Sequence, residues 1–367
     1  MSQSQNPSNP VELWYSRCGA ATASAIAIRK HWLQDEFDRP GTVLRSLRDS
    51  EDNEIQDSHY HHKISGFFRE GGNIPPIWAR SGGRDTVVVG ITWLDEYQGI
   101  LVRKDSRLRS VADLKGKRLG LPLHNNLIDF QRGAAKHGFT TALALAGHGP
   151  DVSTYVDLPA PAESRRGNRW TDDARADRPR FEVEALLAGS VDAIFLRFAH
   201  GVRWSRDERL RQVINLNDLP DPLLRVNNGT PRPITVDRAF LEQHPNLVAR
   251  YLAVLIKTAR WAEANPQDVL KLLVTEGGAA SVEEVLASHG ADVHRSFHPQ
   301  LSERYVKGLE LQKNFLRDHG FLRGDFSVQD WVDPRPLRAA QQLVEKEAGF
   351  AQPHVVRVAA ELASSAT

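Results

Sequence analysis

Short apolar runs alternate with longer amphipathic segments along the first two thirds of this chain, and this alternation limits the possible folds most strongly. Thr86–Thr92, Gly99–Arg103 and Val191–Leu196 are typical of buried strands. The last third is different, because its strongest patterns are two amphipathic helices, Asn246–Ala264 and Leu301–Leu316. Strands that alternate with helices predict an α/β fold, and the helical final third predicts extra C-terminal helices.

Charge balance and cysteine content narrow the classes of function. The 367 residues include 47 Lys and Arg against 46 Asp and Glu, a formal net charge of +1, so we expect no nucleic-acid partner. The chain has no apolar run of transmembrane length, and residues 1–9 form a polar, disordered lead without the apolar centre of a secretory signal. The single cysteine, Cys18, excludes an intramolecular disulfide. We therefore expect a cytoplasmic protein with no membrane partner.

Cys18 lies at a predicted junction between a strand and a helix. Leu13–Tyr15 is a short apolar and aromatic run, and Ala20–Phe37 has the periodicity of one amphipathic helix. A thiol near a helix N-terminus or a cation has a lowered pKa and is more reactive. A lone cysteine is also a common core residue, so both a catalytic and a structural role stay open at this point.

Three segments resemble the nitrate, sulfonate and thiamine-precursor binding proteins: Val89–Pro122, Ala185–Phe195 and Ala239–Leu273. The resemblance implies the two-lobed, periplasmic-binding-protein-like (type II) fold with extra C-terminal helices. Ligands of this fold bind in the cleft between the lobes. The expected lobes are residues 10–104 with 225–367 for lobe one, and residues 105–224 for lobe two.

A narrower resemblance concerns residues of lobe one. Ser16-Arg17-Cys18 is followed by His59, and ten residues later by Arg69–Pro76, which reads REGGNIPP. This pattern is similar to that of the aromatic sulfinate desulfinases of dibenzothiophene desulfurisation, whose R-x-G-G-x-I-P-P motif is matched at every fixed position. The resemblance implies a Cys–His–Arg active site that uses no metal and no organic cofactor.

The resemblance assigns catalytic roles to Cys18, His59 and Arg69. Cys18 would attack sulfur or protonate the ipso carbon, with His59 as its partner. Arg69 would anchor the sulfinate, because a planar guanidinium matches two oxygens better than an ammonium does. Gly71 and Gly72 would let backbone N–H groups approach those oxygens, because no Cβ intervenes.

Aromatic residues near these positions are candidates for the wall of an aryl pocket: Tyr60, Phe67, Phe139 and Phe198. Phe139 takes the place of a bulky aromatic that the family carries in lobe two, and residues 197–200 have lost two of the family's tryptophans. The polar segment 55–68 contains a glycine, and we expect it to form a lid that orders when substrate binds.

These observations predict a monomeric hydrolase that converts an aryl sulfinate, such as 2′-hydroxybiphenyl-2-sulfinate, to sulfite and the arene or phenol. The histidines of 59–62 lack nearby cysteines or a carboxylate pattern, so we expect no metal site. Two alternatives stay open. One is a non-catalytic substrate-binding protein of an ABC importer for a sulfonate or related organic anion. The other is an enzyme that makes a pyrimidine precursor at an iron-and-histidine site, although the cysteine-rich tract of those enzymes is missing.

Overall fold

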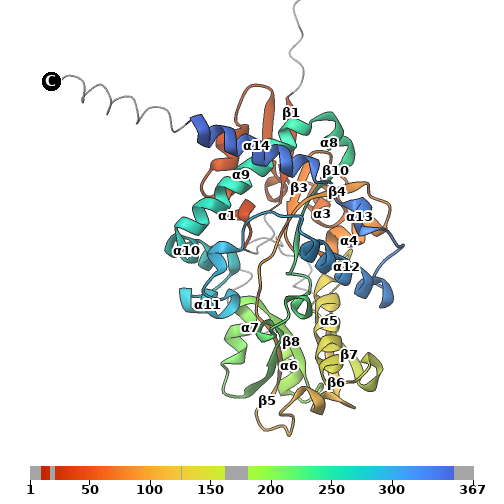
Figure 1. Ribbon diagram of the computed structural model, residues 1–367. Coiled ribbons are helices and arrows are strands. Elements are labelled where there is room, and N and C mark those ends of the chain that lie inside the picture. Colours follow the sequence, from red (N-terminus) through yellow and green to blue (C-terminus); the bar gives the residue numbers. More distant parts are fainter. Residues whose placement is uncertain (1–9, 17–20, 125, 162–180, 351–367) are drawn as a thin grey trace, which may run out of the picture.

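The computed structural model describes residues 10–16, 21–124, 126–161 and 181–350, which form two lobes (Figure 1). The lead expected at 1–9 and the predicted nucleophile Cys18 lie outside the described residues. Among those described, no helix is long and apolar enough to cross a membrane.

Lobe one is built around a five-stranded sheet of order β2-β1-β3-β10-β4. Strand β1 is parallel to β2 and β3, whereas β10 is antiparallel to β3 and β4. The strands are β1 (Val11–Tyr15), β2 (Thr42–Ser46), β3 (Phe67–Glu70), β4 (Thr86–Thr92) and β10 (Arg232–Asp237). Strand β3 is therefore central, with the strand that leads to Cys18 on one side and β10 on the other.

Helices cover both faces of this sheet (Figure 1). Val87 and Val89 of β4 belong to one hydrophobic core, and Val88 and Ile91 to another, because successive side chains of a strand point to opposite faces. The first core contains α1 (Ala23–Arg29), α2 (Trp32–Phe37), α9 (Pro245–Ala264) and α14 (Arg335–Phe350). The second contains α4 (Ile74–Ser81), α12 (Glu303–Asp318) and α13 (Val328–Trp331). The other helices of this lobe are α3 (Asn53–His61), α8 (Arg238–Gln243), α10 (Pro266–Gly277) and α11 (Val282–His289).

The single helix expected over Ala20–Phe37 is wrong, because the chain forms α1 and α2 instead. His31, between them, has φ 62, a left-handed conformation that ends the hydrogen-bond ladder of α1. The break lets α1 bury almost its whole length while α2 turns Leu33 and Phe37 inward. Both pieces are amphipathic, so periodicity alone does not reveal the break.

Lobe two contains a three-stranded sheet of order β8-β5-β9 and a parallel pair, β6 and β7. Its strands are β5 (Gln98–Arg103), β6 (Arg118–Leu123), β7 (Thr154–Pro159), β8 (Ile194–Arg197) and β9 (Leu210–Asn215). Its helices are α5 (Phe130–Leu145), α6 (Phe181–Leu187) and α7 (Phe198–Ser205). The boundary expected after residue 104 needs correction, because β5 pairs with β8 and β9 and so belongs to lobe two. The chain therefore crosses between the lobes at 93–97 and returns before β10.

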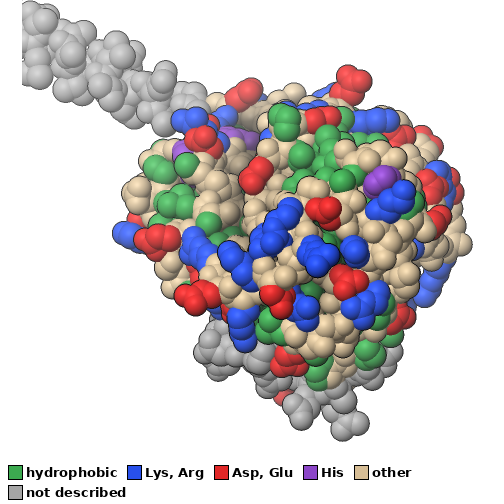
Figure 2. Space-filling model, turned by 90° about the horizontal axis from the view of Figure 1, so that it is seen from below, with side chains coloured by type: hydrophobic (Ala, Val, Ile, Leu, Met, Phe, Trp, Pro, Cys, Tyr) green, Lys and Arg blue, Asp and Glu red, His purple; other side chains and the backbone are tan. Residues whose placement is uncertain are grey.

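The lobes also touch away from these crossings. Arg203 of α7 donates to both carboxylate oxygens of Glu284 in α11, at 3.1 and 3.0 Å. On α5, the ring of His137 stacks on Phe315 of α12, with centroids 4.0 Å apart. Lobe two is thus held against the C-terminal helices by two separate contacts. At its far end, Figure 2 shows Lys and Arg side chains gathered together, with acidic side chains among them.

Candidate active site

Arg69 contacts two other predicted site residues, His59 and Gly72. Its side chain projects from the central strand β3 and is only 1% exposed. The guanidinium donates from Nε to the carbonyl oxygen of His59 at 3.0 Å and from Nη1 to that of Gly72 at 2.7 Å. Arg69 therefore joins the last turn of α3 to the turn that follows β3.

His59 lies in the final turn of α3, where it is buried and its ring meets Tyr60 edge-to-face at 5.0 Å. The helix ends at His61, because His62 adopts a left-handed conformation with φ 53 and donates its N–H to the Ser58 carbonyl. Burial and the nearby guanidinium of Arg69 lower the pKa of His62 well below its usual value. His62 is thus a neutral neighbour of the site.

The lid expected over residues 55–68 is mostly regular structure. Its first part belongs to α3, its last two residues begin β3, and only 62–66 connect them. Asp52 caps α3 by accepting a hydrogen bond from the Glu54 N–H at 2.8 Å. The expected ordering on substrate binding stays a prediction, but it now concerns a short connection rather than a long loop.

The turn at Gly71 and Gly72 packs against a segment that sequence reasoning missed. Gly71 has φ 153, and a Cβ on Gly72 would lie 2.8 Å from the side-chain nitrogen and oxygen of Asn228. The same Asn228 oxygen accepts from the Ile74 N–H at 2.9 Å, where α4 begins. Asn73 donates to the carbonyl oxygen of Pro231 at 2.9 Å. A larger residue at 72 would therefore force the Asn228 side chain to move.

Glu70, the neighbour of Arg69, is a second residue that sequence reasoning missed. It is 1% exposed and accepts hydrogen bonds from the N–H groups of Ala23 and Ser24 at 3.3 and 2.8 Å. Burial raises the pKa of its carboxyl above the usual value. Its bonds secure the start of α1, the part of the chain that follows the Cys18 segment.

The aromatic candidates do not gather in one wall. Tyr60 of lobe one stacks on Phe130 of α5 in lobe two, with centroids 6.4 Å apart, and so spans the lobes. Phe67 is buried in β3 beside His62. Phe139 is fully buried on the inner face of α5, within the second hydrophobic core.

Phe139 therefore serves packing rather than the wall of an aryl pocket. Phe198 is partly exposed and begins α7 with φ 59, in the left-handed region that a bulky residue rarely adopts. Such strained residues cluster at functional sites. Of the four candidates, Tyr60 contacts the other lobe and Phe198 is partly exposed.

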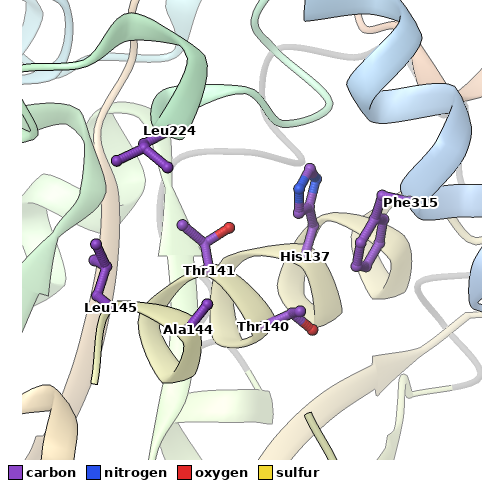
Figure 3. A pocket seen from close by; sticks show the side chains of 7 residues that line it. All are labelled: His137, Thr140, Thr141, Ala144, Leu145, Leu224 and Phe315. Atoms are coloured by element: carbon purple, nitrogen blue, oxygen red, sulfur yellow. The ribbon is translucent and has the colours of Figure 1, made fainter. Parts of the chain in front are cut away.

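A cavity of about 280 Å³ lies elsewhere, where α5 meets Leu224 and Phe315 (Figure 3). Figure 3 shows His137, Thr140 and Thr141 on its α5 side. Its lining contains none of the predicted catalytic residues. Within the residues that the structure describes, no group of three or more His, Cys, Asp or Glu side chains is placed to hold a metal ion.

No protein-family model matches the chain. A 2′-hydroxybiphenyl-2-sulfinate desulfinase of Rhodococcus erythropolis is 26% identical over 353 residues, which span 89% of this chain and 92% of that enzyme. The resemblance to an aromatic sulfinate desulfinase is confirmed.

Solved structures confirm the two-lobed, periplasmic-binding-protein-like fold. A cysteine-to-serine mutant of the desulfurization enzyme DSZB, in complex with biphenyl-2-sulfinic acid, superposes with a TM-score of 0.69 at 23% identity, covering 90% of this chain and 99% of that one. The periplasmic aliphatic sulphonate binding protein of Escherichia coli superposes with a TM-score of 0.61 at 14% identity, covering 89% and 92%. The fold is thus shared by the desulfurization enzyme and a sulphonate-binding protein.

Proposed function

We propose that this chain is a desulfinase that hydrolyses an aryl sulfinate to sulfite and the corresponding arene or phenol. The observation that carries the proposal is the buried Arg69, which holds the His59 turn and the Gly72 turn around one guanidinium. Likeness to the desulfinase over 89% of the chain supports it. A buried cation attracts an anionic sulfinate more strongly than an exposed one, because less water screens the charge.

The overall reaction consumes one water and leaves the charge unchanged: ArSO₂⁻ and H₂O give ArH and HSO₃⁻. On the first route, the Cys18 thiolate attacks sulfur, the C–S bond breaks, and the ipso carbon takes a proton. Water then hydrolyses the resulting enzyme S–SO₂⁻ adduct to hydrogensulfite and thiol. On the second route, the Cys18 thiol protonates the ipso carbon, and the SO₂ released is hydrated to hydrogensulfite.

On both routes the chain's residues have the same tasks. Arg69 attracts and orients the sulfinate, and backbone N–H groups at Gly72 approach its oxygens. His59, held by Arg69 through its own carbonyl, is the partner that exchanges a proton with Cys18. Tyr60 and Phe198 contact the aryl group from lobe one and lobe two respectively.

The decisive experiment is sulfite release by the wild type and by Cys18→Ser. Because the chain contains one cysteine, a thiol-specific reagent reports on this residue alone. We expect the variant to melt like the wild type and to lose about 100-fold or more of the rate. A variant that keeps more than about a tenth of the rate would contradict a catalytic role for Cys18.

A non-catalytic sulfonate-binding protein is the second candidate, supported by the fold shared with the aliphatic sulphonate binding protein. It predicts saturable binding of sulfonates and sulfinates with no sulfite produced. A panel of aryl and alkyl sulfinates and sulfonates, assayed in parallel for calorimetric binding and for sulfite, separates the two functions.

A further inference from the structure

Three buried charged side chains meet where the two lobes join. Glu96, in the crossing between β4 and β5, is fully buried, as is Arg232 at the start of β10. One oxygen of Glu96 accepts from Nε of Arg197, the last residue of β8, at 2.7 Å and also from its Nη2. The other accepts from Nη2 of Arg232 at 3.1 Å. A single carboxylate therefore holds one guanidinium from each lobe.

Arg232 connects this cluster to the candidate active site. Its Nε donates to the Gly229 carbonyl at 2.8 Å, and its Nη1 donates to the carbonyl of Ala21. Ala21 is the first described residue after the Cys18 segment. In the antiparallel register of β10 and β3, Ile234 faces Glu70 and Thr235 faces Arg69.

Two carboxylates thus secure the chain from residue 21 onward, Glu70 directly from β3 and Glu96 through Arg232 of β10. Glu70 accepts from the N–H groups of Ala23 and Ser24, while Glu96 acts through Arg232 on the carbonyl of Ala21. The fit around Glu96 is close, because a Cβ on Gly229 would lie 2.1 Å from its carboxylate oxygen.

The lobe-two side of the cluster reaches a strained residue of the site. The guanidinium of Arg197 lies 4.5 Å from the ring of Phe198, which has φ 59 at the start of α7. Buried charges are costly unless they are paired, and a buried pair is weak evidence for a gain in stability. A cluster that instead ties both lobes to site residues favours a positioning role.

We propose that Glu96 is a positioning residue of the active site: by bridging Arg197 and Arg232 it holds Arg232 against Ala21 and so fixes the chain from residue 21 onward. The inference rests on the proposed function, because positioning matters for turnover only if Cys18 is catalytic. Small displacements of a reacting group lower rates strongly, so loss of Glu96 lowers kcat more than it raises KM.

The test uses two variants of Glu96 and one matched control. Glu96→Gln keeps the shape and removes the charge, whereas Glu96→Asp keeps the charge and shortens the reach. Asp95→Asn is the control, because Asp95 lies in the same crossing and pairs with Arg225 at 2.6 Å, but that pair is about a quarter exposed. Each protein is assayed for sulfite release and for deuterium uptake of the peptide 21–29.

We expect both Glu96 variants to lower kcat about tenfold or more, with KM within about threefold of the wild type, and to speed deuterium uptake in 21–29. Asp95→Asn changes neither measurement. Unchanged uptake overturns the proposal. Faster deuterium uptake with wild-type kcat in the Glu96 variants would show a structural role only. Full kcat in Glu96→Asp would show that the charge alone matters. Either result would also overturn the proposal.

The deuterium measurement keeps the inference separate from the proposed function. If the wild type releases no sulfite from any aryl sulfinate, the proposed function fails, and uptake in 21–29 still decides whether Glu96 orders this segment. If Glu96→Gln does not fold, Glu96→Asp carries the same test, because it retains the charge that the two guanidiniums require.

Discussion

Replacement of Arg69 by lysine is the sharpest test of the site geometry. The arginine side chain donates to two backbone carbonyls, those of His59 and Gly72, from two different nitrogens. A lysine ammonium is a compact point charge on a flexible stem, so it serves one of these carbonyls well and leaves the other without its charged donor. Arg69→Lys therefore keeps the positive charge at this position and removes the forked arrangement of donors.

The expected loss of stability follows from the bond that lysine cannot make. A hydrogen bond to a charged group contributes about 1.5–3 kcal/mol net to the free energy of unfolding, and the carbonyl that loses its charged donor is buried. For a chain of 367 residues that corresponds to a fall in Tm of roughly 2–4 °C. Activity falls further, by about 100-fold or more in kcat/KM, because the turns that carry His59 and Gly72 are no longer held together.

Arg84→Lys is the matched control for this experiment. Arg84 donates from Nε and Nη2 to the single carbonyl of His62, at 3.1 and 2.7 Å, just beyond the same helix. We expect this variant to lose some stability and to keep sulfite release per folded molecule. Thermal melting and sulfite release on the same samples decide between the outcomes. An Arg69→Lys protein with near wild-type activity per folded molecule would refute the reasoning.

Two further predictions follow from packing and from protonation. Gly72→Ala forces the Asn228 side chain to move, so it should destabilise the fold by about 1–3 kcal/mol and lower the activity. Gly82→Ala is the control, because its Cβ would make ordinary contacts at 3.5 Å, and it should change neither the melting temperature nor sulfite release. Burial lowers the pKa of His137 to about 4, so the unfolded chain binds its proton first and stability falls as the pH drops from 6.5 towards 4. Urea unfolding at pH 7.5 and pH 5 should show that His137→Gln, which stays neutral, loses less stability on acidification; equal losses would contradict this assignment.

Much of the architecture could be predicted from local patterns. Apolar runs such as Thr86–Thr92 form buried strands because their side chains suit both faces of a covered sheet. The amphipathic pattern near 246–264 corresponds to α9, whose inner face packs on that sheet. The resemblance to the desulfinase motif also predicted that His59, Arg69 and Gly72 lie together, and Arg69 contacts the other two.

Other features depend on where distant segments meet. Periodicity could not show that His31 breaks a helix or that β5 pairs within lobe two, because each depends on the surface against which the segment packs. Phe139 has the same aromatic character in a core as in a pocket, and its position on α5 decides between them.

The sequence by itself determined the α/β class and, through the resemblance of its R-x-G-G-x-I-P-P motif, the candidate site residues, because strand and helix periods and such a motif are local properties. Only the tertiary structure decided that the Arg69 guanidinium donates to the carbonyls of His59 and Gly72. It also decided that Glu96 joins Arg197 to Arg232 across the lobes. A buried charge is stable only where folding brings its partners to it, and these partners lie about a hundred residues or more away along the chain.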